Sequence, residues 1–470
     1  MRKLLLTTLL LTIFRITAYA QDAQMGSAGL GDSYFPELGN GGYDAIHYTI
    51  DLAWDDRTNV IDSTVTTLAK AYNDLQRFNL DFAGFTVTSV LVDGRKANFH
   101  RDGRELQITP VEPLKQDETF EVVVSYNGVP GKGVSDVYDI FAGGWIRYDK
   151  GVFVASEPDG AALWFPVNDH PLDKATYTFE ITVPDKYVVA ANGRLKSVDN
   201  HDDPTTTYIW EARDEMASYL ATVNVGDFVV DTATGPNNLS IRNYFPARSA
   251  ETLKLTFASF SDMIAFYNDL IAPYPFEAAG AVVADTNLGF ALETQTLILF
   301  GGNVGTRRAE PETVIAHELA HQWFGDSVSI TQWKDIWLNE GFATYLSALW
   351  FEHTQGRTAL LQIMNDYYIF ITNTTNNFSA PGNPPQDDLF NSGVYLRGAW
   401  TLHALRLKVG DEIFFNILKT YYDRFKYSNA ATTDLVSIAI ELSGQDLRPF
   451  FNDWLYAEEV PRKPEQVFTP

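Results

Sequence analysis

The stretch Pro311–Asp326, with the sequence PETVIAHELAHQWFGD, is the most informative part of the chain. Proline suits the first turn of a helix and Gly325 suits the position after its end, so we expect a helix over 311–324. His317 and His321 are one turn apart and project from the same face of that helix. Glu318 lies about 100° around the helix from them. This spacing predicts a metal site.

A third metal ligand is expected from the following segment, Trp337–Ser347 (WLNEGFATYLS). Catalytic zinc takes imidazole and carboxylate ligands and keeps one position open. Glu340 follows His321 with eighteen residues between them and begins the next expected helix, 339–351, which could bring it over the metal. The alternative is that the two histidines form only a hydrogen-bonded polar patch. A carboxylate at this spacing favours the metal site, and the other histidines lack such pairing.

The second half of the chain, 229–470, predicts an α+β domain. Helices are expected over 250–270, 311–324, 339–351, 394–409 and 411–425, where apolar residues recur at helical spacing. Two strands are expected at 280–283 and 291–300. The Asn- and Pro-rich stretch 372–388 is the longest segment here without predicted structure, and its length suggests a functional loop or flap.

The first half, 43–228, has the pattern of short strands. Alternating apolar and polar residues occur in IHYTIDL (46–52), EVVVSY (121–126) and YLATVNV (219–225), and pairs such as Asp-Gly and Asn-Gly separate such runs. This pattern predicts an all-β domain of sandwich or barrel type. The chain as a whole is therefore expected to be multidomain, with a β domain followed by an α+β domain.

The N-terminal residues resemble a targeting segment. Arg2 and Lys3 precede the apolar run 4–14, and Ala18-Tyr19-Ala20 follows as a cleavage signal, so residues 1–20 are predicted to be a signal peptide. An uncleaved membrane anchor is less favoured because eleven apolar residues are too few to span a bilayer. No transmembrane anchor is expected elsewhere, and the protein should be exported to the periplasm or the medium. The Gly-rich stretch 21–42 predicts a flexible lead-in.

Composition excludes several classes of function. The 470 residues include no cysteine, which excludes disulfides, a thiol nucleophile and iron–sulfur clusters. The formal charge of −25 argues against a nucleic-acid partner, because phosphates would be repelled. Neither property indicates an oligomeric state.

The segments HELAHQWFGDSV and DIWLNEGFATYLS resemble the alanyl-aminopeptidase family of gluzincins, which includes leukotriene hydrolase. Two further segments carry the resemblance, WFPVNDHPLDKATYTFEITVP (164–184) and DLFNSGVYLRGAWTLHALR (388–406). The resemblance implies an N-terminal β domain followed by a thermolysin-like catalytic domain. The chain resembles a short form of this family, without the C-terminal helical domain.

The resemblance also implies roles for individual residues. One Zn²⁺ would be held by His317, His321 and Glu340. Glu318 would act as general base and pass the proton to the leaving amine. Tyr395, in GVYLRGA, matches the tyrosine that donates a hydrogen bond to the developing oxyanion.

The resemblance further implies that two acidic residues recognise a free N-terminus. The family has a Gly-x-Met-Glu-Asn strand, and the matching segment here is FALET (290–294), in which Glu293 keeps the amine-binding carboxylate and Ala291 lies in the substrate site. Glu157 matches a second acidic contact ahead of the Phe-Pro segment. Departures from the family pattern occur at Phe290, Leu292 and Thr294. Other motif residues are expected to support helix ends or ligands, namely Asp326, Asn339 and Arg397.

The leading hypothesis is a secreted zinc aminopeptidase that acts on peptides with a free N-terminus. A zinc endopeptidase on the same fold is the first alternative, because the departures around Glu293 could spoil the amine site. The second alternative is a catalytically silent binding module. The intact set of His317, Glu318, His321, Glu340 and Tyr395 argues against that module.

Overall fold

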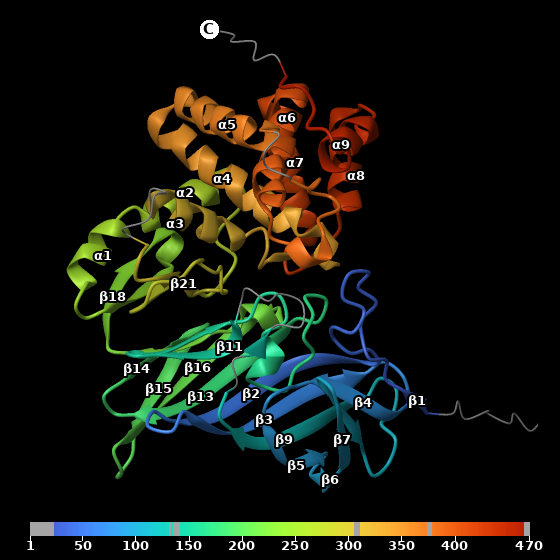
Figure 1. Cartoon of the computed structure of the whole chain (residues 1–470), viewed down its shortest axis with the longest axis vertical. Coiled ribbons are helices and arrows are strands. Elements are labelled where there is room, and N and C mark those ends of the chain that lie inside the picture. Colours follow the sequence, from blue (N-terminus) through green and yellow to red (C-terminus); the bar gives the residue numbers. More distant parts are fainter. Residues whose placement is uncertain (1–22, 131–132, 135–141, 305–310, 374–377, 465–470) are drawn as a thin grey trace, which may run out of the picture.

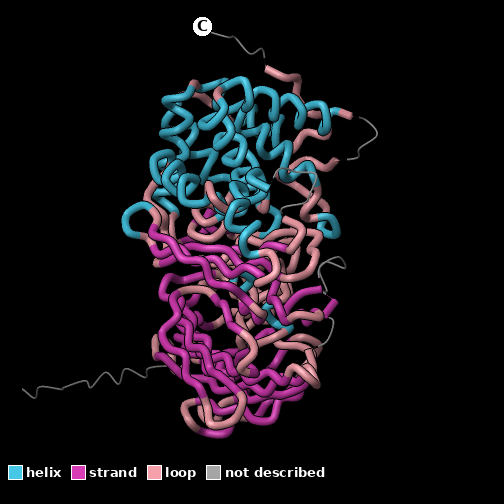
Figure 2. The backbone as a smooth tube through the Cα atoms, turned by 90° about the vertical axis from the view of Figure 1, so that its left-hand side faces the viewer, coloured by secondary structure: helices cyan, strands magenta, loops and turns pink. Residues whose placement is uncertain are grey.

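The computed structural model describes residues 23–464, apart from 131–132, 135–141, 305–310 and 374–377. The predicted signal peptide lies outside the described residues. A strand-rich N-terminal half and a mainly helical C-terminal half lie one above the other (Figures 1 and 2). The chain passes from one to the other at Asp227, between β17 (Val223–Gly226) and β18 (Phe228–Thr234). The predicted order of a β domain followed by an α+β domain is thus confirmed.

The N-terminal half is built on an eight-stranded sheet of order β15-β16-β13-β2-β3-β9-β5-β6. Alternation along its strands buries one face; in β13 the buried side chains include Tyr177, Phe179 and Ile181. The strands of this sheet are β2 Tyr43–Asp55, β3 Val60–Ala71, β5 Thr86–Val92, β6 Arg95–Lys96, β9 Thr119–Gly128, β13 Ala175–Pro184, β15 Arg194–Asn200 and β16 Thr205–Met216.

Two smaller sheets cover the buried face of the large one, which confirms a sandwich-like β domain. Aromatic rings join the layers, because Tyr43 of β2 meets Phe78 of β4 at 5.8 Å and Trp54 of β2 meets Trp145 of β11 at 6.2 Å between ring centroids. The smaller sheets are formed by β1 Gln24–Met25, β4 Leu75–Asp81, β8 Glu105–Thr109 and β7 Asn98–Asp102, and by β10 Gly133–Val134, β11 Ala142–Tyr148, β12 Gly151–Ala155, β17 and β14 Val188–Ala191.

The C-terminal half packs helices against a four-stranded sheet of order β18-β19-β20-β21. The remaining strands of this sheet are β19 Ser240–Pro246, β20 Ala278–Ala284 and β21 Ile298–Gly301. A two-stranded sheet pairs β22 Val328–Ile330 with β23 Ser428–Ala430. The helices are α1 Ala250–Thr256, α2 Phe260–Leu270, α3 Pro311–His321, α4 Trp337–Gln355, α5 Arg357–Thr372, α6 Gly398–Val409, α7 Asp411–Phe425, α8 Thr432–Ser443 and α9 Arg448–Leu455.

Several predicted elements need correction. The helix expected over 250–270 is broken into α1 and α2, and the strand expected over 291–300 is regular only from Ile298, although Leu292 and Leu299 form an isolated bridge. The expected helix over 394–409 begins with a π-helical turn, Gly393–Arg397. Helices α5, α8 and α9 were not predicted.

Helix α4 is buried on all sides over 337–351 and forms the centre of the helical half. It packs closely on the start of α6, directly after the π-helical turn, because small residues meet there. A Cβ placed on Gly341 would lie 3.0 Å from the Cα of Gly398. This close approach holds Tyr395, in the π-helical turn, near Glu340 in the first turn of α4.

The expected flexible lead-in is a wrong prediction for its described part, residues 23–42. Strand β1 pairs with β4, and Phe35 and Leu38 are buried in the core. The Asp32 carboxylate accepts hydrogen bonds from the backbone N–H of Trp333 (2.7 Å) and from Nε2 of His170 (3.2 Å). The segment therefore contacts both halves of the molecule.

Polar contacts hold the two halves together at other points. Lys174, just before β13, is buried, and its ammonium donates to the backbone carbonyls of Asp326 (2.9 Å), Ser327 (3.1 Å) and Ser428 (3.3 Å). Asp214 of β16 accepts a hydrogen bond from the backbone N–H of Glu277 at 3.1 Å. Burial, followed by a hydrogen bond with the side chain of Glu277 and the charge of that side chain, raises the pKa of Asp214 to about 7, although the backbone N–H of Glu277 acts in the opposite direction.

Candidate active site

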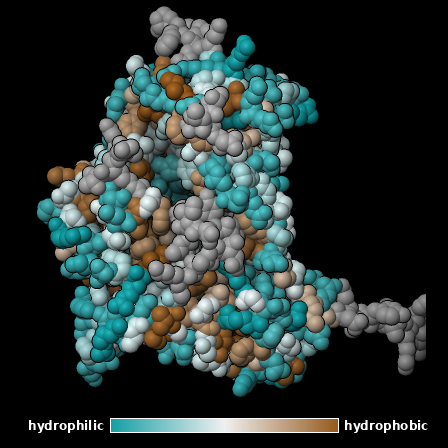
Figure 3. All heavy atoms as spheres, in the orientation of Figure 1, coloured by the Kyte–Doolittle hydropathy of each residue, from teal (hydrophilic) through white to brown (hydrophobic). Residues whose placement is uncertain are grey.

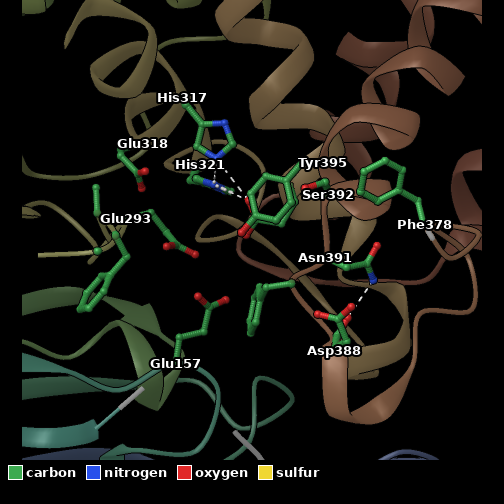
Figure 4. A pocket seen from close by; sticks show the side chains of 15 residues that line it. Glu157, Glu293, His317, Glu318, His321, Phe378, Asp388, Asn391, Ser392 and Tyr395 are labelled. Atoms are coloured by element: carbon green, nitrogen blue, oxygen red, sulfur yellow. Dashed lines mark hydrogen bonds and ion pairs between the residues drawn. The ribbon is translucent and has the colours of Figure 1, made fainter. Parts of the chain in front are cut away.

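A cavity of about 590 Å³ contains the predicted site residues. Its walls come from α3, α4, the π-helical turn, the segment 289–293, the loop 378–392 and, from the N-terminal half, the residues after β12 (Figure 4). A hollow lined by hydrophilic residues is visible on one face of the molecule (Figure 3). The lining residues include His317, Glu318, His321, Glu340, Tyr395, Glu293, Glu157, Ala291 and Phe290.

The three predicted metal ligands point at one another. Nε2 of His317 lies 3.1 Å from Nε2 of His321 and 3.2 Å from Oε2 of Glu340, and Nε2 of His321 lies 3.5 Å from the same oxygen. In a tetrahedral zinc site with bonds of about 2.0–2.1 Å, neighbouring donor atoms are about 3.3–3.4 Å apart. The three atoms thus form one face of a tetrahedron of the right size.

Hydrogen bonds on the far side of each imidazole favour the tautomer that a metal needs. Nδ1 of His321 lies 3.2 Å from the carbonyl oxygen of Phe324, to which it donates. Nδ1 of His317 lies 3.4 Å from Oγ1 of Thr344. A proton on Nδ1 of His321 leaves the lone pair of its Nε2 directed at the common centre, as in metal-binding histidines generally, and the Thr344 hydroxyl can accept a hydrogen bond from Nδ1 of His317 in the same way.

Glu318 and Tyr395 lie beside this centre, on different sides of it. Ligand atoms of Glu318, His321 and Glu293 lie within 4.8 Å of one another. The Tyr395 ring stacks on that of His317 with 5.9 Å between centroids. Burial, followed by the charges of Glu340 and Glu157, raises the pKa of Tyr395 well above its usual value. Its hydroxyl therefore stays protonated and can donate a hydrogen bond.

Glu157 and Glu293 meet across the interface of the two halves. Their carboxylate oxygens lie within 4.8 Å of each other and of Glu340. Burial, followed by the charges of Glu293 and Glu340, raises the pKa of Glu157 well above its usual value, and burial also raises the pKa of Glu293. Four carboxyl groups thus surround two imidazoles, so the cavity favours cations.

The backbone around Glu293 is held by side chains that the sequence pattern did not single out. Gln322, one residue after α3, donates to the carbonyl of Glu293 at 2.8 Å and to Oδ2 of Asp326 at 2.7 Å. The Tyr219 hydroxyl lies 3.5 Å from Oε1 of Glu293. Asn192 donates to the carbonyl of Gln295 at 2.7 Å. The position of Gln322 directly after HELAH is the one signal that could have found it.

The supporting motif residues divide into two groups. Asp326 lies behind the site and accepts from Gln322, and the side chain of Asn339 lies near Gly325, whose added Cβ would be 3.0 Å from Nδ1 of His321. Arg397 supports a helix end, one of the two kinds of role expected for these residues. Its buried guanidinium donates to carbonyls at the end of α9, including those of Trp454 (2.8 Å) and Ala457 (2.6 Å).

The departures from the family strand leave the Glu293 carboxylate in the cavity. Leu292 keeps two backbone hydrogen bonds with Leu299, at 2.8 and 2.9 Å, and the Thr294 hydroxyl donates to the carbonyl of Leu297. Phe290 and Ala291 line the cavity beside Glu293. A smaller adjoining cavity of about 60 Å³ has Phe290, Leu292 and Phe390 in its walls.

The predicted functional loop does reach the site. Phe378 and Asp388, within the stretch 372–388, line the cavity, and so do the following residues Phe390, Asn391 and Ser392. None of these was predicted individually, because nothing in a loop sequence shows which side chains face a distant helix.

Comparison with known proteins agrees with this architecture and donor set, which are those of a metallopeptidase. Residues 44–220 match the model of the peptidase M1 N-terminal domain, and residues 260–454 match that of the peptidase family M1 domain. The chain belongs to peptidase family M1.

Relatives include aminopeptidase M1-A of Oryza sativa subsp. japonica, 26% identical over 410 residues, covering 77% of this chain and 45% of that protein. Aminopeptidase N of Lactococcus lactis is 26% identical, with coverages of 79% and 46%. The chain thus spans less than half the length of these relatives. An M1 zinc metallopeptidase from Deinococcus radiodurans, known from its crystal structure, is 30% identical in sequence to this chain. The two structures match with a TM-score of 0.85 over 94% of this chain and 100% of that one. Among the described residues no helix is long and apolar enough to cross a membrane.

Proposed function

We propose that this protein is a zinc aminopeptidase that releases the N-terminal residue of peptides. The observation that carries the proposal is the short distance between the amine-binding acids and the metal ligands. Oxygens of Glu157 and Glu293 lie within 4.8 Å of the ligand oxygen of Glu340. In a peptide the amine nitrogen and the carbonyl carbon of the same residue are about 2.5 Å apart. An ammonium held by the two acids therefore places the first peptide bond at the metal.

His317, His321 and Glu340 would hold the zinc, and their spacing and tautomers fit it. When bound, zinc supplies a Lewis acid that polarises the scissile carbonyl and favours deprotonation of water. The surplus of carboxyl groups in the cavity also fits, because a divalent cation and a substrate ammonium would offset it.

The side chains of this chain would then do the remaining work. Glu318 lies beside the ligand set and would take a proton from the attacking water and deliver it to the leaving amine. Tyr395 keeps its proton and would donate to the oxygen of the carbonyl as negative charge develops on it. Glu157 and Glu293 would fix the ammonium, which orients the first residue.

The test is a panel of aminoacyl fluorogenic substrates, measured with and without a zinc chelator. We expect hydrolysis that the chelator abolishes and that zinc restores. An N-acetylated peptide should resist cleavage. Cleavage of that blocked peptide together with no activity on the panel would contradict the proposal and favour an endopeptidase.

We also propose that the protein is exported. The support is the sequence of residues 1–20, with two basic residues, an apolar run and a small-residue cleavage signal. Cell fractionation and N-terminal sequencing of the mature protein test this. A cytoplasmic protein that begins at Met1 would contradict it.

A further inference from the structure

A short segment at the N-terminal end of the described chain touches the substrate cavity only indirectly, through the loop 378–392. We define the strap as residues Asp32–Phe35. It lies more than three hundred residues away in sequence from the loop, and the hydrogen bonds of Tyr34 join the two. The strap takes no part in the chemistry described above.

The strap has a rigid base. The Asp32 carboxylate is buried and accepts from the backbone N–H groups of Tyr34 (2.7 Å), Phe35 (3.1 Å) and Trp333 (2.7 Å). Its fourth donor is His170, whose Nδ1 accepts from a backbone N–H, so that Nε2 carries the proton that faces Asp32. A buried carboxylate with four donors fixes the backbone from which Tyr34 extends.

Tyr34 reaches from this base to the loop. Its hydroxyl lies 2.8 Å from the carbonyl oxygen of Pro384, to which it donates, and 3.0 Å from Oδ1 of Asn383. On the other side the backbone N–H of Gly382 donates to the carbonyl of Leu455, the last residue of α9. Residues 382–384 are thus held from both sides.

The residues that follow Pro384 lead directly to the cavity wall. Prolines at 384 and 385 fix φ, and a short 3-10 turn, Gln386–Asp388, follows them directly. The wall residues Asp388 and Asn391 therefore lie only four and seven residues beyond the contact with Tyr34. In Figure 4 these residues and Phe378 lie on the opposite side of Tyr395 from Glu157 and Glu293. If Glu157 and Glu293 hold the ammonium as proposed, this side would receive the peptide beyond its first residue.

We propose that Tyr34 is a positioning residue for peptide binding: by its hydrogen bond to Pro384 the strap holds the wall of the cavity that contacts substrate residues beyond the scissile bond. The inference rests on the proposed function for its kinetic consequence, and its structural part stands independently. Metal ligands and Glu318 lie on α3 and α4, so loss of the contact should weaken binding of long substrates and leave the chemical step unchanged.

The test compares Tyr34→Phe, which removes only the hydroxyl, with Tyr208→Phe as a matched control. The Tyr208 hydroxyl is also half-buried and donates to a backbone carbonyl, that of Tyr187 at 3.1 Å, within the N-terminal half. Asn383→Ala, at the other end of the contact, is the partner variant. Thermal unfolding shows whether each variant is folded. Hydrogen exchange of residues 378–392 and the kinetics of an aminoacyl anilide and a pentapeptide are then measured.

We expect Tyr34→Phe to accelerate exchange in 378–392 at least threefold and to raise KM for the pentapeptide three- to tenfold. The KM for the anilide and both kcat values should stay within twofold, and Asn383→Ala should add little to Tyr34→Phe. Unchanged exchange in the loop, or a KM effect that is equal for the anilide or equal in Tyr208→Phe, overturns the proposal. If the unmodified protein does not cleave the anilide, the proposed function fails, and the exchange measurement alone then decides the role of the strap.

Discussion

Replacement of Glu293 by glutamine tests how the first residue of a substrate is recognised. The change keeps the size of the side chain and removes one of the two carboxylates that are proposed to bind the ammonium. A hydrogen bond to a charged group contributes about 1.5–3 kcal/mol. Glu157 remains in place, so the loss should be about one such interaction. Because 1.4 kcal/mol corresponds to a factor of ten, kcat/KM for an aminoacyl anilide should fall about 10- to 150-fold.

The substrate supplies the control for this prediction. A desamino anilide, which lacks only the ammonium, cannot use the contact, so Glu293→Gln should leave its slow hydrolysis unchanged or raise it. The metal content must also be measured, because Glu293 lies within 4.8 Å of His321. Glu312→Gln is a matched variant, since Glu312 lies in the first turn of α3 and accepts a hydrogen bond from Trp350 outside the cavity.

One result would refute this reasoning. If Glu293→Gln retains its metal and lowers kcat/KM equally for the anilide with and without the ammonium, Glu293 does not recognise the amine. The exopeptidase preference would then need another source.

Three further predictions concern the metal and the interface. A chelator should lower the melting temperature as well as abolish hydrolysis, because without a cation the crowded carboxyl groups lose their counter-charge, and calorimetry with added zinc should show the reversal. Lys174→Met should lower the free energy of unfolding by about 3 kcal/mol in denaturant titration, because the buried carbonyls of Asp326 and Ser327 and the carbonyl of Ser428 lose their donor. Asp214 has a pKa of about 7 in the folded chain against 3.8 unfolded, so the folded state binds the extra proton and stability falls as pH rises from about 4 to 7. The free energy of unfolding of Asp214→Asn should therefore equal that of the unmodified protein at pH 4.5 and exceed it by about 1 kcal/mol at pH 8. This figure is reduced because the group is partly exposed to solvent. If the variant and the unmodified protein have equal melting temperatures at both pH values, the pKa shift of Asp214 is contradicted.

The metal ligands could be predicted because local geometry fixes them. Two histidines four residues apart on a helix must share a face, and one carboxylate in the first turn of the next helix is enough to complete the set. The structure places all three donor atoms within 3.5 Å of one another. Glu157, Glu293 and Tyr395 were within reach only through the family resemblance, because each is an ordinary residue in its own segment.

Contacts between distant segments could not be predicted. The stretch 21–42 has the composition of a linker, yet its Asp32 finds donors 138 and 301 residues away, at His170 and Trp333. No local pattern encodes such pairs. The same limit applies to Tyr219 near Glu293 and to the cavity-facing residues of the loop 378–392, such as Phe390. The family resemblance predicted the fold here, and the fold then determined these contacts.

The two acids proposed to bind the ammonium come from different halves of the molecule, so exopeptidase preference is a property of the interface. Glu157 follows β12 in the N-terminal half, whereas Glu293 precedes β21 in the C-terminal half. Lys174 and Asn192 connect those halves by hydrogen bonds. Because a displacement of about 1 Å can cost 10²-fold in rate, loosening this interface should reduce the preference for a free amine before it reduces hydrolysis itself. The ratio of kcat/KM for free and blocked substrates therefore reports on domain docking, while hydrolysis of the blocked substrate reports on the metal site, which lies wholly within the C-terminal half.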